Sequence, residues 1–326
     1  MNTNVLLVGA GALGSIYAWR LQEGGMHVTC VCRSNYSTVQ SQGFSISSEA
    51  YGQHTYRPSR VVASVDEAVS NGEVFDFIIF CTKALPNLSD NSHIIAPAVS
   101  KNTIIMLIQN GIGIEEPFAE RYPEAPLVSV IAYIDVSQPQ PGSIEHGNVS
   151  ALMMGLHNPA KSGKEIQDRI EKLSGVWNQN GVMCMVVEHI QSFRWLKLVW
   201  NASFNTVSVV SGGNNTRKML DDPHCKQLIR NIMKEVYSIG EAATGAPLPV
   251  IQGKDSPDAF IEDTENRQVP VEPSMLMDFH AKRPMEHDVI LRRPLEVARK
   301  LGVKAPYMEA VYAMLVMVEK TYMARL

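Results

Sequence analysis

Three polar side chains recur every four residues in the apolar segment RWLKLVWNASFNTVSVV: Lys197, Asn201 and Asn205. On an α-helix, residues four apart lie about one turn from each other, so the spacing predicts one polar face. Buried amides need partners and a buried lysine is costly, which favours the wall of a polar cleft. Such a lysine could donate a proton to a carbonyl oxygen as hydride reaches the carbon. The alternative is an ordinary solvated face.

A glycine pattern near the start of the chain, VLLVGAGALGS, is the second candidate site. It follows an apolar run and precedes a helical pattern, as in a dinucleotide-binding turn. The glycines would allow the tight turn, the approach of pyrophosphate and close helix packing, with phosphate held at a helix N-terminus. A glycine turn of purely structural use is the alternative. The predicted cofactor-binding residues are Gly9, Ala10, Gly11, Ala12, Leu13 and Gly14.

The choice of cofactor depends on Arg33, which follows the second expected strand, HVTCVC. An NAD-binding unit usually has Asp or Glu there, which accepts a hydrogen bond from the ribose 2′-OH. A guanidinium can instead pair with a 2′-phosphate through forked hydrogen bonds. Arg33 therefore predicts NADPH/NADP, although an exposed surface arginine is the alternative.

The elements that must position these residues divide the chain into two predicted domains, residues 1–158 and 159–326, separated at the polar segment 157–163. The fold class is α/β: alternating strands and helices predict an N-terminal Rossmann-type parallel sheet, followed by a C-terminal all-helical domain. Strands are expected at 5–8, 27–32, 75–82, 104–109 and 127–136, with a short one at 183–187. The first domain's helices are expected at 13–23, 66–71, 88–99 and 113–121. The later helices are expected at 165–178, 191–210, 223–244, 274–282, 287–301 and 307–323.

The connector 245–273 is long for a compact domain, so it is expected to be a functional loop or poorly ordered.

Composition narrows the class of protein. With 326 residues, of which 45% are hydrophobic and 19% charged, the chain can bury a large core. Its formal net charge of −4 provides no positive field that would attract a nucleic-acid backbone. No apolar run approaches the ~20 residues of a membrane span. With no secretory signal, a cytoplasmic protein is expected. Five scattered cysteines predict neither a disulfide framework nor a metal site.

The order of these motifs resembles that of the ketopantoate reductase (2-dehydropantoate 2-reductase) family, in the 6-phosphogluconate dehydrogenase-like group, from about Val5 to Tyr312. Several spaced motifs in order are more specific than any one alone. They are GAGALGS, Arg33, CTKA with Lys83, QNGIG with Asn110, KLVWNASFN, and SMLMDFHAKRPMEHD with Ser274 and Glu286.

The resemblance implies a role for each matched position. Lys197 is expected to be the catalytic proton donor, and Glu286 the carboxylate that orients it and the nascent hydroxyl. Asn201, Asn205 and Ser274 are expected to contact the substrate, a small keto acid. Lys83 and Asn110 are expected beside the nicotinamide, at the ends of two strands.

Bland alternatives exist for three of these: a surface lysine for Lys83, a turn pair for Asn110-Gly111, and a helix-surface carboxylate for Glu286. The two histidines nearest these motifs, His280 and His287, have no catalytic spacing and are interpreted as structural or exposed.

The sequence departs from the family where bacterial members often have Asn-Gly after the Glu286 motif and this chain has Leu291-Arg292. The leading hypothesis is NADPH-dependent reduction of 2-dehydropantoate to pantoate, in pantothenate biosynthesis. A related reductase of another ketone or keto acid and an NADPH-sensing regulator are the rivals. A homodimer is the expected assembly, with no nucleic-acid or membrane partner.

Overall fold

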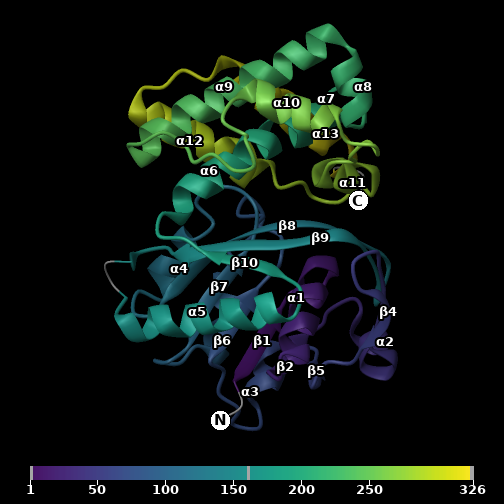
Figure 1. Ribbon diagram of the computed structural model, residues 1–326, viewed down its shortest axis with the longest axis vertical. Helices are drawn as coiled ribbons and strands as arrows, with labels where there is room; N and C mark the ends of the chain where they lie inside the picture. The colour runs from purple at the N-terminus through teal and green to yellow at the C-terminus, as the bar shows by residue number, and fades with distance from the viewer. Residues whose placement is uncertain (1–2, 160–161, 324–326) are drawn as a thin grey trace. The chain divides into compact units, whose positions relative to one another are not determined.

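The computed structural model describes residues 3–159 and 162–323 and forms two compact units (Figure 1). The first consists of residues 1–83, 90–109 and 114–190, and the second of residues 84–89, 110–113 and 191–326, as far as each is described. The division after residue 190 differs from the predicted boundary between 158 and 159. A helix, α5 (Lys164–Gln179), and a strand, β10 (Met183–Val186), cause the difference, because β10 pairs with the sheet of the first unit.

A ten-stranded sheet forms the first unit, in the order β4-β3-β9-β8-β7-β6-β1-β2-β5, with β10 beside β9. The bounds of the first seven strands are β1 Asn4–Val8, β2 His27–Val31, β3 Phe44–Ser48, β4 Gly52–Tyr56, β5 Arg60–Val62, β6 Phe77–Phe80 and β7 Ile104–Ile108. The two long strands are β8 Leu127–Gln140 and β9 Ser143–Leu156.

The predicted parallel arrangement is confirmed for the Rossmann-like strands, since β5, β2, β1, β6, β7 and β8 pair in parallel. The sheet as a whole is mixed, because β8 and β9 form an antiparallel hairpin and β3 pairs antiparallel with β4. Pro141-Gly142 joins the hairpin, and Gly142 has a φ of +79°, a conformation that glycine adopts without strain. The predicted strands did not include β3, β4, β5 or β9.

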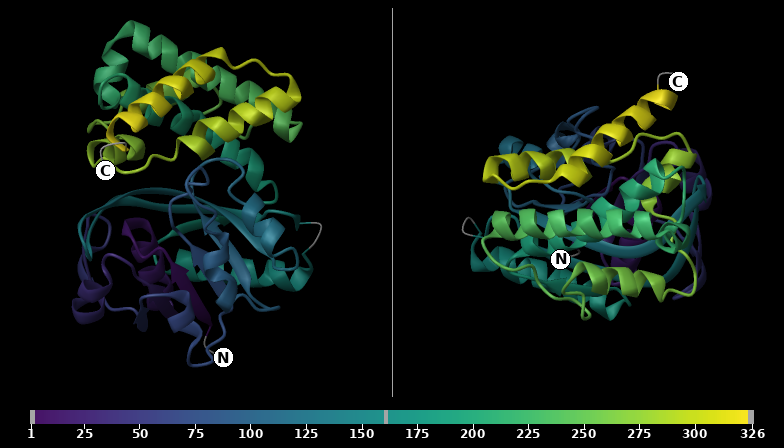
Figure 2. Two further views of the ribbon diagram at one scale, coloured as in Figure 1. Left: turned by 180° about the vertical axis from the view of Figure 1, so that it is seen from behind. Right: turned by 90° about the horizontal axis from the view of Figure 1, so that it is seen from above.

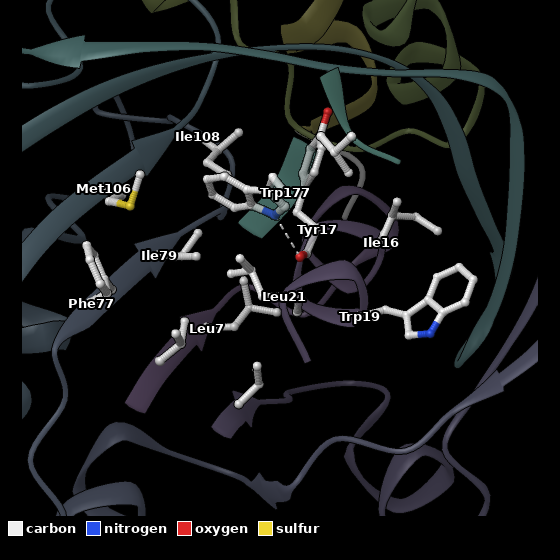
Figure 3. Close-up of a cluster of buried hydrophobic side chains, with 14 of the residues drawn as sticks. Leu7, Ile16, Tyr17, Trp19, Leu21, Phe77, Ile79, Met106, Ile108 and Trp177 are labelled. Atoms are coloured by element: carbon white, nitrogen blue, oxygen red, sulfur yellow. Dashed lines mark hydrogen bonds between the residues drawn. The ribbon is translucent and has the colours of Figure 1, made fainter. Parts of the chain in front are cut away.

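Helices bury both faces of the parallel strands, which explains why these strands are continuously apolar. Alternate strand residues point to opposite faces, and one set joins α1 (Ala12–Glu23) and α5 in a single buried cluster (Figure 3). Within it Trp177 Nε1 donates a hydrogen bond to the carbonyl of Tyr17 at 3.1 Å. The remaining helices of this unit are α2 Tyr36–Gln42, α3 Val65–Val69, the 3₁₀ helix η1 Ser92–Ala98, and α4 Glu116–Arg121.

The second unit is helical, as predicted. In Figure 2 its last helix, α13, is drawn in yellow, and it packs against α7 and α9. The bounds are α6 Ile190–Trp200, the π-helix η3 Asn201–Asn205, α7 Thr206–Val210, α8 Thr216–Asp221, α9 Pro223–Thr244, α10 Pro257–Glu265, α11 Ser274–His280, the π-helix η4 Asp288–Arg292, α12 Arg293–Leu301 and α13 Pro306–Met323.

The connector 245–273, expected to be a functional loop or poorly ordered, contains a helix, α10. Phe260 and Ile261 of that helix are buried, and Thr264 Oγ1 accepts a hydrogen bond of 3.2 Å from Trp200 Nε1. The amphipathic pattern within the connector, PDAFIEDTE, begins after Ser256, whose side chain caps the helix.

No helix among residues 3–159 and 162–323 is long and apolar enough to cross a membrane.

Candidate active site

Lys197, Asn201 and Asn205 lie on one continuous helical rod formed by α6, η3 and α7. In an α-helix residues four apart drift by about 40° around the axis, because each turn takes 3.6 residues. The π-helix η3 spans Asn201 to Asn205. Because each of its turns takes more than four residues, residues four apart are displaced around the axis in the opposite direction there. The predicted α-helical spacing is thus modified at the residues expected to bind substrate. Single π-turns occur frequently at functional sites.

A hydrogen-bonded set joins Lys197 to Glu286 through Asn110. Lys197 Nζ donates to Asn110 Oδ1 at 2.8 Å, and Asn110 Nδ2 donates to Glu286 Oε2 at 3.4 Å. The backbone N–H of Ala84 donates to Glu286 Oε1 at 2.9 Å. Glu286 is only 8% exposed, so it is not the helix-surface carboxylate of the bland alternative.

The turn that carries Asn110 requires glycine at the next position. Gly111 has a φ of +90°, and a Cβ there would lie 2.5 Å from the side chain of Val289. The N–H of Ile112 donates to the carbonyl of Val289 at 2.9 Å, which fixes the turn against η4. Arg194 Nη1 donates to the carbonyl of Gly111 at 3.1 Å. These contacts determine where the Asn110 amide points.

Lys197 has an altered acidity. The pKa of its ammonium is lowered from 10.5 to about 7, mainly by burial and also by the positive charge of Arg194, while the carboxylate of Glu286 opposes both effects. A lysine with a pKa near neutrality can exchange a proton within the physiological pH range. The position therefore suits a general acid.

Asn205 and Ser274 are also brought together. Asn205 Oδ1 accepts a hydrogen bond from Ser274 Oγ at 3.3 Å and another from the N–H of Met275 at 3.2 Å, in the first turn of α11. Asn205 thus fixes the start of that helix. Asn201 is only 7% exposed, and its side chain makes no hydrogen bond to any residue that the structure describes. Its amide remains available to a ligand.

The glycine turn of the first unit has the features of a cradle. Gly9 has a φ of +100°, and its Cβ would lie 2.7 Å from the backbone nitrogen of Thr82; a Cβ on Gly14 would lie 2.5 Å from the carbonyl oxygen of Gly9. Packing therefore explains both of these glycines. A Cβ on Gly11 would meet nothing within 4 Å, so protein packing does not explain this glycine. Open space beside the first turn of α1 fits an approaching phosphate.

Two further observations support a ligand at this turn. The Oγ1 of Thr82, next to Gly9, is buried and has no hydrogen-bond partner among the described residues. Asn35 Nδ2 donates to the carbonyl of Ala10 at 2.7 Å and ties the turn to the segment after β2. Arg33 is exposed in that segment, and Lys83 is exposed three residues after the end of β6.

Leu291 and Arg292, where the sequence departs from the family pattern, lie in η4. Leu291 is fully buried, and the guanidinium of Arg292 is bound by Asp288 and Glu296 within its own helix. The change is thus compensated locally by ion pairs at a spacing of four residues.

Sequence reasoning missed two residues, Arg194 and Asn35. Arg194 is 3% exposed and lies three residues before Lys197, a spacing that puts both on one helix face. An arginine between apolar residues, in FRWLKL, was the available signal. Asn35 carried no spacing signal, because its contact to Ala10 joins residues 25 positions apart.

The comparison with known families agrees with this geometry. The description "Ketopantoate reductase PanE/ApbA" matches residues 5–159, and that of its C-terminal domain matches residues 189–319. The chain belongs to the ketopantoate reductase family. It is therefore an enzyme, an oxidoreductase that uses a pyridine nucleotide, and the predicted family is confirmed.

Three relatives illustrate the similarity. The 2-dehydropantoate 2-reductase of Nostoc sp. is 28% identical over 94% of this chain and 92% of its own. A crystal structure of 2-dehydropantoate 2-reductase from Methylococcus capsulatus is 35% identical, with a TM-score of 0.86 over 98% of this chain and 97% of that one. A ternary structure of D-mandelate dehydrogenase with NADH and anilino(oxo)acetate shares the fold alone, at 17% identity and a TM-score of 0.84, covering 98% and 99% of the chains.

Proposed function

We propose that this chain reduces 2-dehydropantoate to pantoate with NADPH, using Lys197 as the proton donor. The observation that carries the proposal is the hydrogen-bonded set of Lys197, Asn110 and Glu286. It combines a lysine that ionises near neutral pH with an amide and a carboxylate that hold it. Reduction of a carbonyl requires such a donor for the oxygen.

The proton path starts at Lys197 Nζ. Lys197 Nζ donates a hydrogen bond to Asn110, which sets the direction of the ammonium group. Bound NADPH would supply hydride to the carbonyl carbon. As negative charge grows on the oxygen, the ammonium stabilises it and then transfers the proton.

Glu286 keeps the lysine protonated and oriented. Its carboxylate raises the pKa of Lys197, opposing burial and Arg194. One of its oxygens is held by the N–H of Ala84 and the other by Asn110, so the negative charge has a fixed place. Asn110 was expected beside the nicotinamide; its contacts add a role between the two catalytic residues, and the nicotinamide contact stays a prediction.

For the substrate, we propose that Asn201 donates hydrogen bonds to the keto acid and that Ser274, held by Asn205, lies near its carboxylate. The first role is supported by the buried position of Asn201 and by the absence of a hydrogen bond from its amide to any described residue. Asn205 is the weaker candidate for direct contact, because its carbonyl oxygen already accepts two hydrogen bonds. Sites built around such polar groups reject analogues that leave them unpaired.

For the cofactor, we propose that residues 9–14 hold the pyrophosphate and that Arg33 binds the 2′-phosphate of NADPH. The open space at Gly11 and the orphaned Thr82 hydroxyl support a nucleotide at this turn. Arg33 is exposed after β2 and followed by Ser34, so no carboxylate stands there to repel the phosphate. Lys83 is proposed as a further cofactor contact.

The test is the oxidation of NADPH, followed by its absorbance, across a panel of keto acids that includes 2-dehydropantoate, pyruvate and an aryl keto acid. We expect the highest kcat/KM with 2-dehydropantoate. A protein that reduces the aryl keto acid but not 2-dehydropantoate would refute the named substrate and leave the family unchanged. Reduction of an aryl keto acid is the second candidate function, because D-mandelate dehydrogenase has the same fold.

An NADPH-sensing regulator is disfavoured, because a protein that only binds has no need of the Lys197 set. A homodimer stays a prediction, which sedimentation of the purified protein would test.

A further inference from the structure

The segment before η4 has no regular structure of its own, and α13 holds it. Residues 283–286 lie in no helix or strand. Tyr322 of α13 donates its hydroxyl to the carbonyl of Arg283 at 3.0 Å. Glu319, also on α13, accepts from the N–H of Met285 at 2.7 Å through Oε1 and contacts His287 Nε2 at 2.7 Å through Oε2. The two carboxylate oxygens thus bind the neighbours of Glu286 on either side.

These two contacts are strong and specific. Met285 is fully buried, His287 is 4% exposed, and the side chain of Glu319 is only 13% exposed. A buried carboxylate costs free energy unless it is satisfied, and hydrogen bonds to an ionised group are stronger than neutral ones. A carboxylate can only accept, so Nε2 of His287 carries the proton.

Because both neighbours of Glu286 are held, the direction of the Glu286 side chain is set as well. We propose that Glu319, together with His287, is a positioning residue that aims the Glu286 carboxylate at Ala84 and Asn110, and through Asn110 fixes Lys197. This inference rests on the proposed function, because it gives the two contacts of Glu319, here called the clamp, a purpose in the same site. The hydrogen bonds of Glu319 go to Met285 and His287, so it would act on Lys197 only through Glu286 and Asn110.

The ionisation state of Glu319 is consistent with the clamp. Burial raises the pKa of its carboxyl, but the hydrogen bonds from His287 and the Met285 N–H and the charge of His287 outweigh burial, so the pKa lies below its usual value. Glu319 is therefore a carboxylate at neutral pH. The ring of Tyr312, from the same helix, packs against His287 with centroids 5.8 Å apart.

The experiment compares E319A and E319Q in the full-length protein, with E309Q as a matched control. Glu309 lies on the same helix but is exposed and pairs with Arg299 at 3.2 Å. The first measurement needs no activity: competitive acetylation with acetic anhydride over a range of pH, read by mass spectrometry of the peptide that contains Lys197. The second is kcat and KM with the keto acid that the wild-type protein reduces fastest.

For E319A we expect the midpoint of Lys197 acetylation to move to lower pH, as in E286Q, because a misdirected Glu286 no longer favours the ammonium. We expect kcat to fall by ~10- to 100-fold with little change in KM, since a small misplacement of a catalytic group acts on the chemical step. E319Q keeps an oxygen for the Met285 N–H and should retain most of both properties. E309Q should match the wild type.

A wild-type Lys197 midpoint in E319A would overturn the proposal. So would equal shifts in E319A and E319Q, which would indicate a through-space effect of the Glu319 charge. Should E319A fail to fold, H287A removes one of the two contacts, and an unchanged midpoint there refutes the clamp. If the wild type reduces no keto acid, the proposed function fails while the acetylation measurement still decides this inference.

Discussion

The acidity of Lys197 makes the pH dependence of the reaction predictable. Only the ammonium form can donate a proton, and burial together with Arg194 lowers its pKa to about 7 against the opposing effect of Glu286. Above this pH the ammonium fraction falls about tenfold for each pH unit. We therefore expect kcat/KM, which reports the free enzyme, to fall from near neutral pH with a slope of about −1.

The assay measures initial rates at low keto acid and saturating NADPH over a range of pH at constant ionic strength. NADPH affinity is measured over the same range, so that a change in cofactor binding is not mistaken for this fall in kcat/KM, the alkaline limb of the pH profile. K197R is the control: a guanidinium stays protonated, so whatever activity remains should lack the alkaline limb. A wild-type profile that stays flat two pH units above neutrality, or a limb that persists in K197R, would refute Lys197 as the general acid.

The direction of each neighbour's effect gives a second check on the same limb. R194M removes a positive charge, so the midpoint should rise, whereas E286Q removes the opposing negative charge, so it should fall. The opposite order would show that the charges named here do not control the lysine.

Three other predictions follow from the two units. R33A should weaken NADPH binding by ~1.5 to 3 kcal/mol while NADH binding changes little, because one charge-assisted phosphate contact is lost; equal losses by calorimetry would contradict the assignment. G9A should lower the melting temperature, since its Cβ would meet backbone at 2.7 Å, whereas G11A should melt like the wild type but bind NADPH less well. N205A should be destabilised by ~1 to 3 kcal/mol because two donors lose their acceptor, while N201A should fold normally and raise KM for the keto acid; the reverse pattern in denaturation and kinetics would exchange their roles.

Local patterns were sufficient for the Rossmann-like strands and most helices, because continuous apolar runs and amphipathic periods report burial directly. They were insufficient for β3, β9 and the edge strands β4 and β5. In β4, for example, four of five residues are exposed, so no apolar run marked it. The connector was misjudged because its helix α10 is short, and its buried residues became recognisable only by their packing against α8 and α9.

The candidate site was found in part. The spacing of Lys197 and Asn201 and the glycine pattern are local signals, and family resemblance supplied Glu286. Asn110 was predicted as a site residue, but its contacts with Lys197 and Glu286 were not. Those partners lie 87 and 176 residues away in the sequence. Arg194 was overlooked for a related reason, since its partner is a backbone carbonyl, which has no signature in the sequence.

The second unit is not a continuous stretch of chain, since it includes residues 84–89 and 110–113. A gene fragment that begins near residue 190 would encode every helix from α6 onward and still lack Asn110 and Ala84. In such a fragment Lys197 would lose its amide acceptor and Glu286 its backbone donor. Recombination between relatives at this boundary would therefore join the helices of one parent to the two short loops of another. Lys197 and Glu286 would then keep their matched hydrogen-bond partners only if those loops were exchanged along with the helices.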